Sequence, residues 1–260
     1  MADDVARFYD DLSNHYHLLL EDWERSLSWQ AELLEGLIGE RLGPGVKRIL
    51  DPACGIGTQA LGLARRGHSI AGSDLSAAAV ARAKREAKQR DLELSLTVAD
   101  MRSLSGYHAG PFDAVCIMDN SLTHLREDKD LLTTLQECAA LLRPEGVLLA
   151  SIRDYDALQE SRPKVTKPRV FDDKSGRRVV FQVWDWRSDG AGYRVHQYIL
   201  RQKSKSGPVD PLVFTTDYWC LTRARLFDLL TQAGFAGVEW LEAQDTGFYQ
   251  PIVAARTAKA

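Results

Sequence analysis

Residues 46–59 read VKRILDPACGIGTQ. This stretch is a short apolar run that ends in Asp51, followed by Gly55 and Gly57 and then by a helical pattern. A strand, a glycine turn and a helix in this order are typical of nucleotide-type cofactor sites, because glycine lets the backbone approach the ligand closely. The stretch therefore predicts a cofactor site at the first turn of an α/β fold.

Behind this stretch the chain alternates between strand-like and helix-like patterns. Short apolar runs predict strands at 46–51, 69–74, 92–98, 112–118, 146–152, 238–241 and 249–256, and amphipathic periodicity predicts helices at 58–66, 77–89, 129–142 and 223–233. Strands and helices that alternate at this spacing form a parallel sheet with helices on both faces. The sequence therefore predicts a doubly wound, Rossmann-like α/β fold.

Two segments outside this alternation are expected to cover the cofactor turn. Residues 1–43 contain two helical patterns, the first near 7–20, and we expect them to form a lid. Residues 154–215 are rich in β-forming side chains, and the glycine-containing turn at 188–192 is a hairpin signal. We expect an antiparallel β insertion over the active site, with residues 1–260 forming a single domain.

The composition favours a small-molecule partner. The 260 residues carry 33 Lys and Arg against 36 Asp and Glu, and a net charge of -3 offers no general attraction to nucleic acid. No run approaches the roughly 18 apolar residues of a membrane helix, and no apolar signal segment opens the chain. We therefore expect a cytoplasmic protein without nucleic-acid or membrane partners. The composition leaves open whether the protein forms a homo-oligomer. The irregularly spaced cysteines, for which we expect reduced core thiols and no metal site, are Cys54, Cys116, Cys138 and Cys220.

Aspartates stand where the first four predicted strands end, at Asp51, Asp74, Asp100 and Asp119. In a doubly wound sheet the ligand binds outside the carboxyl ends of the strands. One such aspartate is often a helix cap or a turn residue, but four at consecutive strand ends favour a ligand. Asp74 suits ribose hydroxyls and Asp100 suits the adenine amino group. Asp51 and the region of the Asp119 carbonyl suit the ammonium and sulfonium charges of an adenosyl cofactor.

The glycine turn alone also fits a dinucleotide site. Residues 55–60 satisfy the Gly-x-Gly-x-x-Ala pattern of nicotinamide-dependent dehydrogenases, and Asp74 lies near the expected distance for a ribose-binding acid. A carboxylate such as Asp51 is unfavourable beside a pyrophosphate, and Asp100 adds a further acid. The strand ends therefore favour S-adenosylmethionine over NAD, while a nicotinamide-dependent oxidoreductase remains an alternative.

The chain resembles the class I S-adenosylmethionine-dependent methyltransferases through DPACGIGT at 51–58 and GSDLS at 72–76. The resemblance narrows to the group of glycine N-methyltransferase and glycine/sarcosine N-methyltransferase through FDAV at 112–115, NSLTHL at 120–125, RPEG at 143–146 and RDYD at 153–156. It implies a seven-stranded sheet whose last strand is antiparallel. It also implies S-adenosyl-L-methionine as the cofactor and S-adenosyl-L-homocysteine as the product.

The resemblance implies cofactor roles for the glycine turn, for the end of the second strand and for the adenine position after the third. It also implies that an arginine of the N-terminal helices contacts the cofactor carboxylate. The residues that take these positions are Arg25, Ala53, Gly55, Asp74, Leu75, Asp100 and Met101.

On the substrate side the resemblance places Tyr9 near the transferring methyl group, Asn120 near the substrate amine and Arg153 at the substrate carboxylate. The residues alone agree on Arg153, because a planar guanidinium at the carboxyl edge of the sheet suits a carboxylate, although an ion pair with Asp154 or Asp156 is an alternative. His124 is a candidate base. A lone histidine is more often structural, and methyl transfer to a neutral amine needs little base, so positioning is the stronger hypothesis.

The sequence thus predicts an S-adenosylmethionine-dependent N-methyltransferase of a small amine, with glycine, sarcosine or a related amino acid as substrate. Three other hypotheses remain open. These are an O- or N-methyltransferase of a natural product, a nicotinamide-dependent oxidoreductase, and a sensor that binds S-adenosylmethionine without chemistry.

Overall fold

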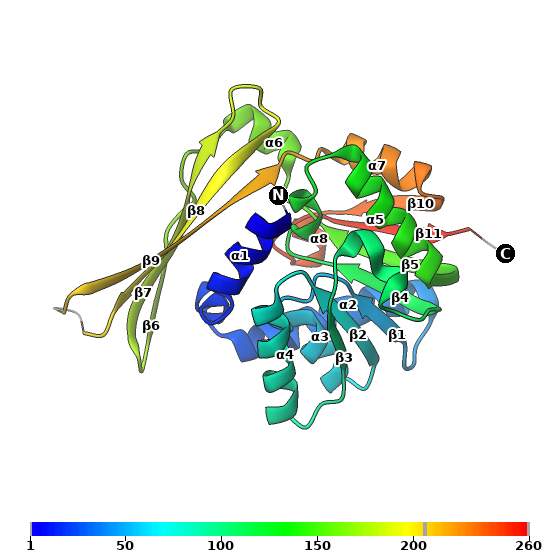
Figure 1. Cartoon of the computed structure of the whole chain (residues 1–260), viewed down its shortest axis with the longest axis horizontal. Helices are drawn as coiled ribbons and strands as arrows, with labels where there is room; N and C mark the ends of the chain where they lie inside the picture. Colours follow the sequence, from blue (N-terminus) through cyan, green and yellow to red (C-terminus); the bar gives the residue numbers. More distant parts are fainter. Residues whose placement is uncertain (1, 205–206, 259–260) are drawn as a thin grey trace.

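The computed structural model describes residues 2–204 and 207–258, and Figure 1 shows two sheets with the N-terminal helix between them. The larger sheet has seven strands in the order β10-β11-β5-β4-β1-β2-β3. Its strands are β1 (Arg48–Asp51), β2 (Ser69–Asp74), β3 (Ser95–Val98), β4 (Phe112–Ile117), β5 (Leu142–Ser151), β10 (Phe235–Leu241) and β11 (Ile252–Thr257). Strands β1 to β5 are parallel, whereas β11 is antiparallel to both β5 and β10. The predicted doubly wound α/β fold with an antiparallel last strand is confirmed.

Helices cover both faces of this sheet. One face packs against α2 (Trp23–Leu42), α3 (Thr58–Arg65) and α4 (Ala77–Gln89), and the other packs against α5 (Asp128–Leu141) and α7 (Arg223–Gln232). Successive residues of a strand point to opposite faces, so Ile49 joins the first buried cluster and Leu50 joins the second. The short helical segments are η2 (Met101–Gly106), η3 (Ser121–His124), α6 (Tyr155–Ser161) and α8 (Ala243–Thr246).

The N-terminal segment differs from the single helix predicted near 7–20. It forms α1 (Ala2–Leu12), a turn, and the 3-10 helix η1 (Tyr16–Leu19), because Ser-Asn-His at 13–15 favours a turn over a continued helix. Asp10 links α1 to α4 by hydrogen bonds. Its Oδ1 accepts hydrogen bonds from the Ser76 hydroxyl at 2.5 Å and from the Ala78 N–H at 3.0 Å, at the N-terminus of α4.

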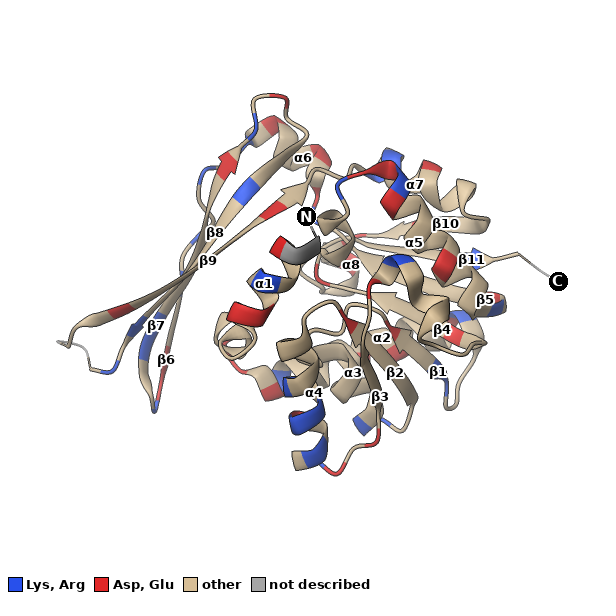
Figure 2. Cartoon of the chain, in the orientation of Figure 1, with Lys and Arg blue, Asp and Glu red and all other residues tan. Residues whose placement is uncertain are grey.

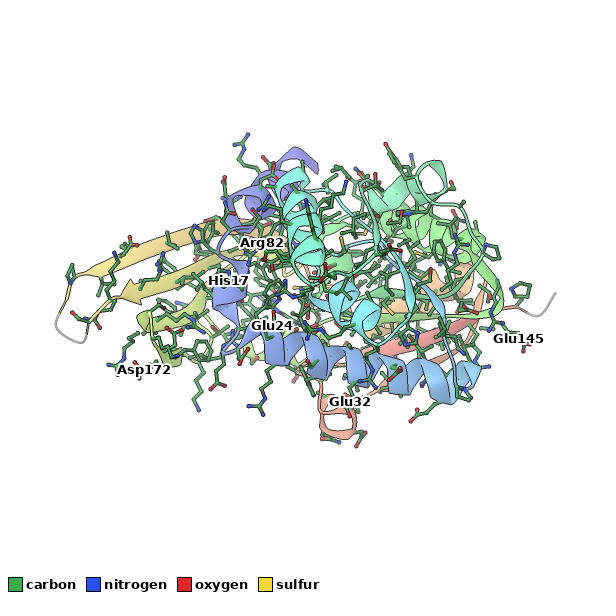
Figure 3. All side chains as sticks on the ribbon, turned by 90° about the horizontal axis from the view of Figure 1, so that it is seen from below. His17, Glu24, Glu32, Arg82, Glu145 and Asp172 are labelled. Carbon is green, nitrogen blue, oxygen red and sulfur yellow. The ribbon has the colours of Figure 1, made fainter. Side chains whose placement is uncertain are left out.

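Charged side chains of α4 extend this attachment. The helix carries basic residues along its length (Figure 2), and Lys84 and Arg85 are exposed. Arg82 is instead buried, and its Nη1 donates a hydrogen bond of 2.5 Å to the Ser13 carbonyl. Figure 3 labels Arg82 and Glu24, which lies at the start of α2. Glu24 forms ion pairs with Arg65 and Arg90. Helices α1 and α2 are therefore attached to the sheet through α3 and α4.

The second sheet is antiparallel, with the order β6-β7-β8-β9. Its strands are β6 (Arg169–Asp173), β7 (Gly176–Trp186), β8 (Gly192–Gln202) and β9 (Val209–Trp219). The turn predicted at 188–192 does join β7 to β8, with Trp186 opposite Tyr193. Side chains on the inner face, among them Trp184 and Tyr218, join the buried cluster of α5 and α7. Because of these contacts, the second sheet shares a core with the first.

Within residues 2–204 and 207–258, no helix is both long and apolar enough to cross a membrane. The four cysteines are buried and form no disulfide bond. Among the same residues, His, Cys, Asp and Glu side chains form no group of three or more that could hold a metal ion.

Candidate active site

The glycine turn after β1 is held against the end of β2. Gly55 and Gly57 have φ angles of 52° and 95°, in the left-handed region that favours glycine. The Gly55 N–H donates a hydrogen bond of 2.8 Å to Asp74 Oδ2, and the Ser76 N–H donates one of 2.8 Å to Asp74 Oδ1. A single carboxylate therefore fixes the turn and the start of α4, and each of its oxygens keeps a lone pair for a ligand.

A pocket opens at the carboxyl ends of β1, β2, β3 and β4, and we call it the cofactor pocket. The predicted site residues that line it are Tyr9, Ala53, Gly55, Asp74, Leu75, Asp100, Met101, Asp119 and His124. Gly57 does not line the pocket. It is needed in the turn, because a Cβ at this position would lie 2.9 Å from Leu61. The structure thus brings together side chains from the N-terminal helix and from four strand ends.

Asp51 ends β1 directly before Pro52 and Ala53, which line this pocket; it does not line the pocket itself and is buried, with 3% of its surface exposed. Its Oδ1 accepts one long hydrogen bond of 3.4 Å from the Ala53 N–H, and its Oδ2 has no hydrogen-bond partner. Burial raises the pKa of Asp51 to about 8, and the nearby charges of Asp74 and Asp119 act in the same direction. A buried carboxylate among like charges is unfavourable, and a cationic ligand would relieve it.

Asp100 is paired with a residue that the sequence analysis missed. Arg102 donates hydrogen bonds from Nε and Nη2 to the two Asp100 oxygens, and Arg102 Nη1 reaches Asp130 at 2.8 Å. Although burial opposes the change, these bonds lower the pKa of Asp100, so the carboxylate stays ionised. Arg102 and Asp130 also line the cofactor pocket. The predicted adenine position therefore contains an ion-pair network in which Arg102 bridges Asp100 and Asp130.

A second cavity adjoins the first and is enclosed by the N-terminal segment and the inner face of the second sheet, and we call it the substrate cavity. Tyr9, Tyr16 and Asp119 line both cavities. These three side chains mark the junction where the two cavities meet.

Arg153 lines the substrate cavity from the end of β5. Its guanidinium donates hydrogen bonds to the Tyr193 hydroxyl at 2.5 Å and to Gln182 Oε1 at 3.0 Å. It also lies 4.8 Å from the ring centroid of Trp184 and 5.0 Å from that of Tyr218. In the part of the chain that the structure describes, no carboxylate forms an ion pair with Arg153. The predicted alternative, an ion pair with Asp154 or Asp156, is therefore absent: Asp154 caps α6 and pairs with Arg223, and Asp156 accepts a hydrogen bond from the Arg223 N–H.

His124 and Tyr9 contact each other at the edge of the cofactor pocket. The distance from the Tyr9 hydroxyl to His124 Nε2 is 2.8 Å, and the ring of His124 lies 4.5 Å from that of Tyr218. Burial lowers the pKa of His124 to about 3, and the charges of Arg153 and Arg126 act in the same direction. The imidazole is therefore neutral near pH 7 and a weak base, which favours positioning over proton removal.

Besides Asp51 and Gly57, two more predicted residues, Asn120 and Arg25, lie outside both cavities. Asn120 is 1% exposed, and its side chain hydrogen bonds to the Arg153 N–H at 3.0 Å and to the Tyr155 hydroxyl at 2.9 Å. Asn120 therefore holds the backbone of Arg153 from outside the substrate cavity. Arg25 is exposed on α2, with its N–H bonded to the Asp22 cap. The structure does not bring Arg25 to the cofactor pocket.

The sequence analysis also missed the contacts of Asp119. Gln59 Nε2 donates a hydrogen bond of 2.9 Å to Asp119 Oδ2, and the Tyr249 hydroxyl donates one to Oδ1. Gln59 closes the stretch that opened the sequence analysis, so its place in the first turn of α3 was a usable signal. Tyr249 lies in the loop before β11, and nothing local in the sequence indicates its contact.

The fold and the pocket define a Rossmann-like enzyme with a nucleoside cofactor, and comparisons with known proteins give the family. A methyltransferase-domain family model matches residues 49–146. A glycine/sarcosine N-methyltransferase of Parasynechococcus marenigrum is 37% identical over 197 residues, which cover 69% of this chain and 68% of that protein. The chain belongs to the S-adenosylmethionine-dependent methyltransferases.

Solved structures share the fold. An S-adenosylmethionine-dependent methyltransferase from Clostridium acetobutylicum has a TM-score of 0.72 at 14% identity, with 99% of each chain covered. CalS10, an amino pentose methyltransferase from Micromonospora echinaspora with S-adenosylmethionine bound, has a TM-score of 0.69 at 21% identity, with 88% of this chain and 92% of that chain covered. At these identities the likeness shows the fold alone.

The residues of the cofactor pocket fit S-adenosylmethionine. The unpartnered Oδ2 of Asp51 and the raised pKa of that carboxyl match a cofactor that carries positive charge. Asp74 accepts one hydrogen bond on each oxygen from the backbone N–H groups of Gly55 and Ser76 and keeps lone pairs for ribose hydroxyls, whereas both oxygens of Asp100 already accept two bonds from Arg102. The glycine turn leaves room for close approach. A dinucleotide pyrophosphate would add negative charge beside Asp51, so the nicotinamide alternative is disfavoured.

Proposed function

We propose that the protein transfers a methyl group from S-adenosylmethionine to the amine nitrogen of a small amino acid, with glycine and sarcosine as the first candidates. The observation that carries this proposal is Arg153. Its guanidinium lines the substrate cavity, is surrounded by aromatic rings, and has no carboxylate partner within residues 2–204 and 207–258. An enclosed cation without a counter-ion is unfavourable, and a substrate carboxylate would neutralise it.

The geometry around Arg153 supports a carboxylate site. Tyr193, Gln182 and the backbone contact with Asn120 hold the guanidinium in one orientation, so little side-chain entropy is lost when a substrate binds. An amino sugar would leave this cation unpaired. The relationship to a glycine/sarcosine N-methyltransferase agrees with an amino acid substrate.

The chain's own residues would act mainly by positioning. S-adenosylmethionine supplies the electrophilic methyl group when it is bound. The glycine turn, Asp74 and Asp100 would hold it at the strand ends, while Arg153 would orient the acceptor in the adjoining cavity. Tyr9 and Tyr16 at the junction would exclude water and align the acceptor nitrogen with the methyl carbon. Orientation of this kind contributes several kcal/mol to such transfers, roughly 7 or more in favourable cases.

An activity screen tests the proposal. The purified protein is incubated with S-adenosylmethionine carrying a deuterated methyl group and with a panel of amines, and products are detected by mass spectrometry. The panel holds glycine, sarcosine, dimethylglycine, β-alanine, methylamine and an amino sugar. We expect methylated product from amino acids and none from methylamine. Faster turnover of the amino sugar than of every amino acid would show that the substrate class is wrong.

A variant of Arg153 tests the carboxylate contact. Arg153→Lys keeps the charge but loses the planar fork and its bonds to Tyr193 and Gln182. We expect the KM for the amino acid to rise about 10–100-fold, which corresponds to about 1.5–3 kcal/mol, with cofactor affinity unchanged. The matched control is Arg177→Lys, at a half-exposed arginine of the second sheet that pairs with Asp172 outside both cavities. An unchanged KM in Arg153→Lys contradicts the carboxylate contact.

A further inference from the structure

Asp119 occupies an unusual place at the junction of the two cavities. It follows β4 directly and lines both the cofactor pocket and the substrate cavity. Its φ angle is 60°, in the left-handed region that a non-glycine residue seldom adopts. The Asp119 N–H donates a hydrogen bond of 2.8 Å to Ser151 Oγ, which fixes this backbone against the end of β5. The strained backbone conformation of Asp119 therefore directs its carboxylate toward the junction.

The carboxylate is oriented by donors and retains accepting capacity. Gln59 bonds to Oδ2 and Tyr249 bonds to Oδ1, one donor on each oxygen. Gln59 is itself held by Gln30 Oε1 at 2.7 Å. A carboxylate oxygen accepts more than one hydrogen bond, so both oxygens can still receive a donor from the cavity.

Asp119 and Arg153 are the anionic and cationic ends of one site. They follow neighbouring parallel strands, β4 and β5, and both line the substrate cavity. The residue after Asp119, Asn120, accepts a hydrogen bond from the Arg153 N–H, so the two strand ends are tied together. A zwitterion with an ammonium group close to its carboxylate matches this arrangement of opposite charges.

We propose, building on the function proposed above, that Asp119 binds the substrate ammonium group and takes the proton that the amine must lose before methyl transfer. The ammonium gives one proton to the Asp119 carboxylate, which leaves a neutral amine and a carboxylic acid. The nitrogen lone pair then forms the bond to the methyl carbon, while the carbon–sulfur bond breaks and its electron pair stays on sulfur. The product is an N-methylated ammonium, and Asp119 returns its proton to solvent when the products leave.

The surroundings of Asp119 suit this role. Burial raises the pKa of its carboxyl, although the hydrogen bonds from Tyr249 and Gln59 oppose the change. The other titratable groups that face it are Asp51 from β1 and Tyr16 from η1, and Arg169 acts on Tyr249. A carboxyl with a raised pKa is a better proton acceptor for an ammonium group than an ordinary one. His124, the predicted base, is less suited because its pKa is lowered.

The decisive experiment compares Asp119→Asn with Tyr249→Phe and the wild-type protein. Calorimetry measures glycine binding to the complex with S-adenosylhomocysteine, and methyl transfer is followed from pH 6 to pH 10. For Asp119→Asn we expect at least tenfold weaker glycine binding and partial recovery of kcat/KM above pH 9, where free amine is abundant. Asp119→Glu should retain more activity than Asp119→Asn at neutral pH.

Tyr249→Phe provides a readout that a purely structural role of Asp119 would not move. Loss of the tyrosine donor destabilises the ionised carboxylate, so the acidic limb of the kcat/KM profile should shift to higher pH. An unshifted limb, or glycine binding that Asp119→Asn leaves intact, overturns the proposal for Asp119 while the enzyme still methylates amino acids. A wild-type protein that methylates no amino acid overturns the proposed function itself, and the role of Asp119 with it.

Discussion

At the scale of single residues, the carboxylates at the strand ends have unequal environments. Asp74 and Asp100 are each bonded by several donors, whereas Asp51 is buried with Oδ2 unpartnered and a pKa of about 8. Without a cofactor, ionised Asp51 destabilises the folded state. With a cationic cofactor, the same charge contributes to binding. Asp51 therefore links cofactor affinity to pH.

Asp51→Asn should separate these two effects. The pKa of the carboxyl is about 8 in the folded protein against an ordinary value of 3.8, so protonation favours the fold. The stability of the cofactor-free protein should fall as pH rises from about 4 to about 8, because only the unfolded chain has lost this proton. We expect Asp51→Asn to have a higher Tm than wild type at pH 8, to show a weaker fall of Tm between pH 5 and 8.5, and to bind S-adenosylmethionine at least tenfold more weakly. Thermal scans and calorimetry check this, and an equal fall of Tm in both proteins would contradict it.

At the scale of elements, the N-terminal segment is the part that encloses both cavities. Val5, Tyr9 and Tyr16 line the cofactor pocket, and Phe8 and Leu12 pack against Val180 and Ile199 of the second sheet. Polar contacts of Asp10 and of Arg82 attach this segment to α4. On its other side the segment is bound by Arg178 of the second sheet, which donates hydrogen bonds to the carbonyls of Leu18, Leu20 and Glu21. The attachment to α4 is therefore one of two anchors of this segment.

Asp10→Ala should loosen this segment without unfolding the sheet. The change removes the acceptor of Ser76 and Ala78 at the start of α4, which costs about 1 kcal/mol at a helix N-terminus. We expect faster amide hydrogen exchange in residues 2–19 and a faster dissociation of S-adenosylhomocysteine, by about 3–10-fold. The matched control is Asp11→Ala, at the exposed neighbour. Equal exchange in Asp10→Ala and Asp11→Ala would show that Asp10 does not hold the lid.

The sequence correctly predicted the strands and helices whose ends are marked by local sequence signals. The bounds expected for β2 and α4 agree with the structure, because an apolar run and a Ser76 cap mark them. Strands β6 and β9 were missed: β9 carries Pro211 and exposed polar residues, and it is a strand because β8 pairs along its whole length. In the site, strand ends could be read from the sequence.

The hydrogen bonds between site residues that are distant in the sequence could not be predicted from local patterns. Asp119 meets Tyr249 across 130 residues, and the neighbouring Asn120 turns into the core to bond with Tyr155. Both depend on tertiary packing that brings β4, β5 and the loop before β11 together. Sequence reasoning therefore located the carboxyl edge correctly but did not distinguish side chains that face the cavity from those that support it.

At the scale of the whole molecule, the two sheets and the N-terminal segment together surround the cavities. Trp184, Tyr193 and Tyr218 of the second sheet share a buried cluster with Leu122 and Leu221, near the ends of the first sheet. The two cavities that meet at the junction are lined by side chains from all three parts. Ligand binding should therefore stabilise the protein as a unit.

Differential scanning calorimetry tests this expectation. At a concentration 100 times its Kd, a ligand that binds only the folded state adds about 2.7 kcal/mol, which corresponds to a rise in Tm of roughly 5–10 °C for a chain of this size. We expect S-adenosylhomocysteine to produce this rise within a single transition, because the sheets share a core. NAD should leave the Tm unchanged, since its pyrophosphate would face Asp51. A shift with NAD would restore the dinucleotide alternative, whereas a second transition that S-adenosylhomocysteine leaves in place would show that the second sheet unfolds independently of the cofactor pocket.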